Sequence, residues 1–474
     1  MSNTASQMNP IESYGKWLAE APAAWPGEAL HSAKRQLIDV MGVTILGAVD
    51  EATTRVFATV QEWGDGPCTV IGQSRTLSAP WAALVNGTAA HALDLDDNFD
   101  PAKAHATAVL APAILALGEQ EHVTGQACLD AYICGLQIMG RVGQGVNPTH
   151  RNRGWHATAT VGALGAAAAC ARLLKLNAEQ AGHAVSLATS MAAGFMSQFG
   201  TMAKPTHAGL AAKAGVIAAS MARNGVTAGR ETLDGPTGMN RLMVGPDYEE
   251  LRDAINKPEH GQTLRFKTEQ VGEPLLILEH GLKAKRFANC ASAHRSMDAL
   301  LLLKEEHGFS VDDVSKIIAR LPTTHLNNLM HHDPQDPMQA KFSLQYGLAV
   351  ALLTGTCTLE DFLPEAIMRS EIRSLYEFIE ARPVDKSEGE FPTSVEVHLK
   401  TGTCVEKSLA MPLGSKAAPF TDEQYWRKFD DCVSGLLSED EAVRVKKAME
   451  DFAELPDLAS LLSPLRRPLH PNGM

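Results

Sequence analysis

The sequence predicts a mainly helical protein that also carries a smaller α+β domain. From residue 10 to about 245 the chain has few β-branched runs and many segments rich in alanine and glycine, whose small side chains let helix backbones approach closely. Beyond residue 273, segments with alternating apolar and polar residues appear, which is typical of strands. The chain has 474 residues and 45% of them are apolar, so we expect two domains with a large buried core.

The larger, all-helical domain is expected at residues 1–268. The glycine-rich residues 229–239 predict a loop, and the polar residues 256–273 predict the link to the next domain. Elsewhere in this domain, apolar residues recur at helical spacing and alanine is frequent. The helices expected on this basis lie at residues 81–94, 106–119, 158–174, 178–197 and 208–224.

The smaller α+β domain is expected at residues 269–410. The stretch SKIIARLP at 315–322 predicts a strand, and the alternating residues around Thr401 and Gly402 predict a hairpin at 394–410. Helical periodicity returns at Thr421, so residues 411–474 are expected to form helices that return to the first domain. Two helices should flank the strands, at about 291–306 and 338–353.

Composition and charge exclude several classes of function. The formal net charge is −13, which disfavours binding to nucleic acid or to anionic membranes, and aromatic residues make up only 5% of the chain. The eight cysteines contain no C-x-x-C pair, so they fit neither a zinc knuckle nor an iron–sulfur cluster. The N-terminal residues lack the basic and apolar regions of a secretory signal, and we expect a cytoplasmic protein.

The stretch HALDLDDNFDPAKAHATAVL, residues 91–110, concentrates acids and histidines in an alanine-rich region. Asp96, Asp97 and Asp100 spell D-D-x-x-D, which helical prenyl synthases use to hold Mg²⁺. A second metal motif is missing downstream, and Pro101 should break the helix, so we expect no metal here. Two interpretations stay open. Either Asp94 orients a histidine that moves protons, or the stretch is a polar corner between two helices.

Three further segments place basic residues and a histidine just before a helix, in a chain with a strong negative charge. Each segment taken alone could be an ordinary capped helix or a solvated basic loop. Together they could form one site for a substrate with two or three carboxylates, because cations also ease removal of a proton next to a carboxylate. The residues are Arg151, Arg153 and His156; Lys204 and His207; and Lys283, Lys285, Arg286, Cys290 and His294.

The chain resembles the MmgE/PrpD family, in order and over nearly its whole length. The matching stretches are NGTAAHALDLDDNFDPAKAHATAVL, GWHATATVGALGAAAA, FGTMAKPTHAGLAAKAG, GPTGM, LKAKRFANCASAHRSMDALL and AKFSLQYGLA. That family includes 2-methylcitrate dehydratase, cis-aconitate decarboxylase and iminodisuccinate epimerase. The resemblance implies a large helical domain with an α+β lid and a site between them. It also implies a homodimer that uses neither a metal nor an organic cofactor.

Carried over motif by motif, the resemblance implies a set of site residues. Two positions differ from the pattern that it implies for decarboxylases, because Asn98 stands where threonine is expected and Cys290 where some members have histidine. The lid segment also differs from the FHAQ-like pattern of methylcitrate dehydratases. The implied catalytic residues are His105 and His156 as proton carriers, Asp94 as the orienting acid, and Lys204 and Lys285. The implied substrate-binding residues are Asn98, His207, Arg286 and Cys290.

These observations predict an enzyme that acts on a small di- or tricarboxylate by proton abstraction next to a carboxylate. We expect a cofactor-independent lyase of the dehydratase or decarboxylase type. Loss of hydroxide, loss of CO₂ and return of the proton pass through related carbanion-like states. An epimerase of an amino- or imino-dicarboxylate such as iminodisuccinate is therefore an alternative. An alternative of another class is a non-catalytic helical scaffold that binds anions.

Overall fold

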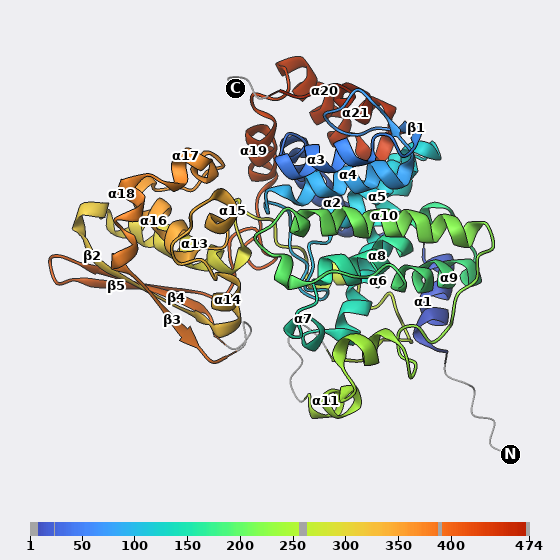
Figure 1. Ribbon diagram of the computed structural model, residues 1–474, viewed down its shortest axis with the longest axis horizontal. Helices are drawn as coiled ribbons and strands as arrows, with labels where there is room; N and C mark the ends of the chain where they lie inside the picture. The colour runs from blue at the N-terminus through green and yellow to red at the C-terminus, as the bar shows by residue number, and fades with distance from the viewer. Residues whose placement is uncertain (1–7, 23, 256–262, 387–390, 471–474) are drawn as a thin grey trace. The chain divides into compact units, whose positions relative to one another are not determined.

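The computed structural model describes residues 8–22, 24–255, 263–386 and 391–470 (Figure 1). The chain divides into two compact units, a helical unit of Met1–Leu282 with Thr421–Met474 and an α+β unit of Lys283–Phe420. The predicted fold class, mainly helical with a smaller α+β domain, is confirmed. Among the described helices, none has both the length and the apolar character that crossing a membrane requires.

The helical unit contains helices of one to six turns and one short strand. Single-turn 3₁₀ helices lie at Met196–Gln198, Phe452–Glu454 and Ser463–Leu465, and a π-helical turn lies at Asn240–Val244. The remaining elements are α1 (Pro10–Glu20), α2 (Gly27–Gly47), α3 (Glu51–Val60), β1 (Asp65–Cys68), α4 (Ala79–Ala92), α5 (Thr107–Gln120), α6 (Gly125–Val146), α7 (Thr149–Asn152), α8 (Ala157–Leu173), α9 (Ala178–Thr189), α10 (Ala203–Arg223), α11 (Tyr248–Ala254), α12 (Leu276–Glu279), α19 (Asp422–Val433), α20 (Glu439–Glu450) and α21 (Ala459–Leu462).

Helices α4, α8 and α10 pack closely because small residues line their contacts. A Cβ atom on Gly209 of α10 would lie 2.1 Å from the carbonyl oxygen of Leu84 in α4, so only glycine fits there. The buried residues of α8 are mostly alanine and glycine. This close packing brings the beginnings of α8 and α10 near the end of α4, and these three helix ends carry the candidate site.

The predicted helix at 178–197 ends early, at Thr189, and this shorter helix helps to place His156. Beyond it the chain runs beside Gly154 and Trp155. The backbone N–H of His156 donates to the carbonyl of Gly194 at 3.0 Å, and that of Met196 donates to the carbonyl of Gly154 at 2.8 Å. Alanine content favoured a longer helix, but these tertiary hydrogen bonds compete successfully with helix propensity.

The C-terminal helices pack on the helical unit, as predicted. Gln36 of α2 donates to the hydroxyl of Tyr425 in α19 at 3.1 Å, and Lys428 donates to the carbonyl of Leu95 at 2.9 Å. Helix α20 begins with a capping box in which Ser438 and Glu441 each bond the other's backbone N–H.

Residues 263–282 join the helical unit through buried polar contacts with α6. Gln137 donates to the carbonyl of Val271 at 2.7 Å and accepts from the N–H of Leu276 at 2.8 Å. The compact units consequently divide after Leu282 and after Phe420, somewhat later in the chain than the boundaries expected at 268 and 410. Residues 256–262 of the predicted link lie outside the described residues.

The α+β unit contains a four-stranded sheet in the order β3-β2-β4-β5. Strand β2 (Val314–Pro322) pairs parallel to β3 (Ile379–Val384) and antiparallel to β4 (Thr393–Leu399), which forms a hairpin with β5 (Cys404–Leu409). Helices α13 (Ala291–His307) and α16 (Leu344–Thr354) pack against this sheet (Figure 1). Short helices complete the unit: α14 (Thr323–Asn328), α15 (Pro337–Ala340), α17 (Pro364–Ile367) and α18 (Ser370–Arg373), with single 3₁₀ turns at Val311–Asp313, Glu360–Phe362 and Tyr376–Phe378.

Candidate functional site

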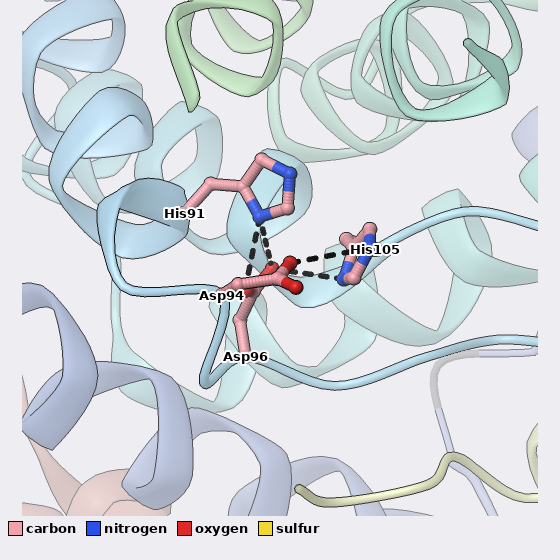
Figure 2. A group of neighbouring side chains, drawn as sticks. All are labelled: His91, Asp94, Asp96 and His105. Carbon is pink, nitrogen blue, oxygen red and sulfur yellow. Dashed lines mark hydrogen bonds and ion pairs between the residues drawn. The ribbon is translucent and has the colours of Figure 1, made fainter. Parts of the chain in front are cut away.

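The site begins where α4 ends. Helix α4 stops at Ala92, two residues before the end expected at 94, so Asp94 lies beyond the helix and does not share a helix face with His91. Asp94 has a φ of 55°, a left-handed conformation that aspartate tolerates better than most residues, and its N–H bonds the carbonyl of His91 at 3.3 Å. This turn reverses the chain and brings Asp96 back against His91 (Figure 2).

Asp96 is the carboxylate that two histidines share. His91 Nδ1 lies 2.9 Å from Asp96 Oδ2, and His105 Nδ1 lies 3.3 Å from the same atom. His105 Nδ1 also donates to the carbonyl of Asp97 at 2.9 Å, which leaves Nε2 as the nitrogen that can accept a proton. The role of Asp96 was not predicted from the sequence, where it stood out only as part of D-D-x-x-D. The signal was a second acid two residues beyond Asp94.

Burial and neighbouring charges together determine the ionisation of Asp96 and His91. Burial alone would raise the pKa of Asp96, but the charges and hydrogen bonds of His91 and His105 lower it well below its usual value. Burial lowers the pKa of His91 to about 4. At neutral pH Asp96 is therefore ionised and His91 neutral. His91 donates from Nδ1, and its buried Nε2 has no hydrogen-bond partner among the described residues.

A buried hydrogen-bond network fixes the segment that carries His105. The hydroxyl of Thr107 donates to the carboxyl group of Asp97 and accepts from Tyr132 at 2.7 Å. The N–H of His105 donates to Thr158 Oγ1 at 3.1 Å. Burial raises the pKa of Asp97 to about 7. The carboxyl group of Asp97 therefore serves this network, and the donor atoms that lie close enough together for a metal ion come from His91, Asp94, Asp96 and His105 rather than from the D-D-x-x-D spacing.

Lys204 lies in the first turn of α10, which begins at Ala203, five residues before the expected start. Its ammonium group bonds to Asp94 Oδ1, and both side chains are 5% exposed. His105 Nε2 lies 3.9 Å from the same Asp94 oxygen. The Lys204 nitrogen also lies 5.4 Å from the centre of the Phe199 ring. Asp94 thus lies between a buried cation and the basic nitrogen of His105.

His156 and His207 form a second buried pair beside this array. Their Nδ1 atoms are 3.0 Å apart, and the His156 ring lies 6.1 Å from that of His91 and 4.9 Å from Phe199. Burial lowers the pKa of His156 well below its usual value. Burial, assisted by the charge of Lys204, also lowers the pKa of His207. Both rings are therefore neutral near pH 7, and one of them donates its Nδ1 proton to the other.

Two further predicted residues of the helical unit are Asn98 and Arg153. Asn98 lies in the loop between α4 and α5, and its buried Nδ2 has no hydrogen-bond partner within the described residues. Arg153, from the first basic segment, pairs instead with Asp247 at 2.8 Å and is 43% exposed. The first basic segment therefore places His156 beside His207, whereas its Arg153 forms a separate ion pair with Asp247.

Lys285, Arg286 and Cys290 belong to the α+β unit. The side chain of Lys285 is buried, and Arg286 pairs with Asp298 at 3.0 Å. Cys290 is the N-cap residue of α13 and is partly exposed, and its N–H donates to the carbonyl of Lys341 at 2.9 Å. Their predicted roles in catalysis and binding stay predictions.

Four side chains of the helical unit could also hold a metal ion. His91, Asp94, Asp96 and His105 each offer one donor atom, and these atoms lie within 4.8 Å of one another. However, the ammonium group of Lys204 already bonds to Asp94, and Asp96 accepts from two histidines. These contacts give both carboxylates cationic or N–H partners supplied by the protein itself.

Comparisons with known proteins identify the family. The family model for the MmgE/PrpD N-terminal domain matches residues 15–251, and the model for the MmgE/PrpD C-terminal domain matches residues 287–454. The chain therefore belongs to the MmgE/PrpD family, which confirms the resemblance seen in the sequence.

Several curated proteins are similar to this chain over nearly its full length. The cis-aconitate decarboxylase-like protein oryM of Aspergillus oryzae (strain ATCC 42149 / RIB 40) is 26% identical over 475 residues, covering 94% of this chain and 96% of that protein. The cis-aconitate decarboxylase of Homo sapiens is 27% identical over 461 residues, covering 93% and 91%. That of Mus musculus is 26% identical over 460 residues, covering 93% and 89%.

Proposed function

We propose that this protein is a lyase that acts on a small di- or tricarboxylate by moving a proton at a carbon next to a carboxylate. The single observation that carries the proposal is the buried array in which Lys204, Asp94, His105, Asp96 and His91 contact one another in turn. A buried cation beside an oriented histidine is suited to proton transfer at an acidic carbon. Similarity to three proteins named for cis-aconitate decarboxylation supports a tricarboxylate substrate.

Each residue of the array has a proposed role. Asp96 holds His105 with Nδ1 as the donor, so that Nε2 accepts the substrate proton or returns it. Asp94 positions both His105 and Lys204, and the Lys204 ammonium group stabilises negative charge that develops on the substrate carboxylate. His156 is the second proton carrier, and His207 sets its tautomer. Asn98, with its unpartnered amide nitrogen, is a donor for the substrate.

The α+β unit is proposed to supply the remaining binding groups. Lys285 and Arg286 provide positive charge for carboxylates, and Cys290 lies at the start of α13, where helix N–H groups suit an anion. The reaction itself needs neither a metal nor an organic cofactor under this proposal, because Lys204 supplies the positive charge and the histidines carry the protons. The protein is proposed to be a cytoplasmic homodimer, and sedimentation equilibrium measures its oligomeric state.

The fate of the carbanion-like state decides which reaction follows. In decarboxylation, loss of CO₂ creates this state and a proton is then added to carbon. In the other two reactions proton abstraction creates it, after which loss of hydroxide gives dehydration and return of the proton to the opposite face gives epimerisation. Epimerisation is the second candidate because His105 and His156, the two proposed proton carriers, come from different helix starts. Iminodisuccinate is the substrate to test for that reaction.

One experiment in D₂O tests the proposal and separates its alternatives. The protein is incubated with cis-aconitate, citrate, 2-methylcitrate and iminodisuccinate, and NMR follows the protons next to the carboxylates. A decarboxylase gives a new product that carries deuterium, a dehydratase gives an unsaturated product that has lost a C–H signal, and an epimerase gives deuterium in an acid of unchanged connectivity. His105→Gln should abolish each of these signals, whereas His31→Gln, a matched change at an exposed histidine of α2, should not. Saturable binding without exchange for any acid would indicate an anion-binding scaffold instead.

Chelation gives an independent test of the metal-free mechanism. Activity should survive dialysis against EDTA, because Lys204 already supplies a cation at Asp94. Loss of activity after chelation, and its recovery with one divalent metal, would instead assign the four donors around Asp96 to a metal site.

A further inference from the structure

The β4–β5 hairpin carries a second group of metal-binding side chains, in the α+β unit. His398 of β4 pairs directly with Cys404 of β5 in the ladder, so their side chains lie on the same face. Glu396 precedes His398 by two residues and shares that face because side chains alternate along a strand. All three side chains are partly or fully exposed, so a metal ion can reach them from solvent.

The spacing of the three donor atoms fits a zinc ion. His398 Nε2 lies 3.5 Å from Glu396 Oε2 and 3.9 Å from Cys404 Sγ, and all three donors lie within 4.8 Å of one another. Zn–N and Zn–O bonds of about 2.0–2.1 Å and Zn–S bonds of about 2.3 Å place tetrahedral donors about 3.3–3.6 Å apart. The His398–Glu396 distance already falls in this range, and a shift of a few tenths of an ångström, about the size of side-chain fluctuations, would bring Cys404 Sγ to the same distance from His398.

The neighbouring charges also prepare this group for a cation. Arg320 donates to Glu396 Oε1, which orients Oε2 toward His398. Lys316 lies opposite His398 in the ladder between β2 and β4. Its ammonium nitrogen forms an ion pair with Glu380 Oε2 at 2.5 Å. Glu406 pairs with Glu396 in the ladder and adds negative charge on the same face.

Cys404 differs from the other seven cysteines of the chain. It is the only one that is exposed, whereas Cys290 is partly buried and the other six are buried. A thiolate, an imidazole and a carboxylate form a donor set typical of zinc, since soft sulfur and borderline nitrogen select it over magnesium or calcium.

We propose that Glu396, His398 and Cys404 form a surface zinc site that ties β4 to β5. Water or the carboxylate of Glu406 completes the coordination. The site is separate from the histidine and lysine array of the helical unit, and it contains a sulfur ligand that the array lacks. Zinc binding therefore stabilises the hairpin and leaves proton transfer unaffected.

Cobalt binding to the untagged full-length protein tests this proposal. Co²⁺ should bind with a thiolate-to-metal charge-transfer absorption in the near ultraviolet, and Zn²⁺ should displace it stoichiometrically. Cys404→Ser should abolish that band, and His398→Ala should weaken zinc binding by more than about 100-fold, because even outer-shell partners are worth about 10–100-fold. His307→Ala, a matched change at an exposed histidine of α13 in the same unit, should leave both unchanged.

Thiol alkylation gives a second readout that requires no coordination spectrum. Zinc should protect Cys404 from a thiol-specific reagent in the wild-type protein but not in His398→Ala. A cobalt complex without the charge-transfer band, or equal alkylation rates with and without zinc, would overturn the proposal. Retention of the band in Cys404→Ser would place the thiolate ligand elsewhere and would also overturn it.

Discussion

The carboxylate of Asp96 contacts two histidines at once: it is the acceptor for His91 Nδ1, and it shares His105 Nδ1 with the carbonyl of Asp97. Because Asp96 is completely buried, solvent cannot replace its hydrogen bonds if it is changed. At the scale of single residues, the proposed chemistry therefore depends on an acid that need not touch the substrate. Asp96 is a positioning residue for His105.

Asp96→Asn tests this positioning role. The amide keeps the shape but can present an N–H group to His105 Nδ1, which favours the wrong tautomer. We expect kcat to fall about 10²–10⁴-fold, as is usual when a general acid–base group is disabled, with little change in KM. Steady-state kinetics on the acid that the D₂O experiment identifies measures both constants. A change confined to KM would contradict the assignment.

Lys204→Met removes the cation that bonds Asp94. An uncompensated buried charge typically costs about 3–5 kcal/mol, so urea unfolding should show a loss of that order. Adding Asp94→Asn in the same chain should restore much of the stability, because the unpaired charge disappears, but it should not restore activity. If the double variant recovered activity, Lys204 would be structural only.

The site residues that could be identified from the sequence stand beside helix ends. Asp94, His105, His156, Lys204 and His207 come together, although 113 residues separate the first from the last. Asp96 was missed because its role depends on the reversal of the chain after Ala92. A left-handed residue that is not glycine leaves little trace in the sequence.

At the scale of elements, the crossing of α4 and α10 places Lys204 against Asp94. Gly209→Ala should force these helices apart, because a Cβ would lie 2.1 Å from a backbone oxygen that cannot move independently. We expect the free energy of unfolding to fall by about 1–3 kcal/mol, the usual effect of overpacking, with a loss of activity as the two side chains separate.

Gly27→Ala is the matched control for this prediction. Gly27 begins α2 and has open space around the position of its Cβ. Its replacement should leave the free energy of unfolding unchanged or slightly raise it, because alanine restricts the unfolded chain. Equal unfolding midpoints in urea for Gly209→Ala and wild type would show that the crossing tolerates expansion.

Elements with a strong local pattern were predictable, and elements determined by tertiary contacts were not. The strand at 315–322 and the hairpin around Gly402 were predicted within one residue or two, because alternation and a turn glycine mark them. Strand β3 was not predicted. It is a short edge strand that contains Pro383, and its parallel pairing with β2 depends on a distant segment.

At the scale of the whole molecule, buried histidines make stability depend on pH. Burial lowers the pKa of His91 to about 4 and that of His150 to about 3, against about 6.5 in the unfolded chain. Below pH 6.5 the unfolded chain therefore binds more protons than the folded one, and the free energy of unfolding falls. Asp97, whose pKa burial raises to about 7, acts in the opposite direction.

The histidines should outweigh Asp97, because burial also lowers the pKa of His156 and His207. We expect each of His91 and His150 to remove on the order of 1–2 kcal/mol between pH 7 and pH 5. Urea unfolding at several pH values measures this slope. His150→Asn should make it shallower without affecting the proposed site, whereas an unchanged slope would show that His150 titrates normally.

Because the whole chain has a net charge of −13, basic residues beside several helix starts were a useful indication of an anion-binding site. Composition alone excluded nucleic acid as an expected partner, and the two-domain prediction followed from length and from the change of pattern after residue 273. The course of residues 263–282 could not be predicted, because it depends on side chains of α6 that accept and donate buried hydrogen bonds.

The measurement that tests the central claim most directly is deuterium incorporation from D₂O, by the wild-type protein and by Asp96→Asn side by side. The account predicts that the wild type moves hydrogen between solvent and the carbon next to a carboxylate of a small polycarboxylic acid, seen as deuterium gained or as a C–H signal lost. Asp96→Asn should do so about 10²–10⁴-fold more slowly while still binding the acid. Equal rates of incorporation in the two proteins would contradict the account.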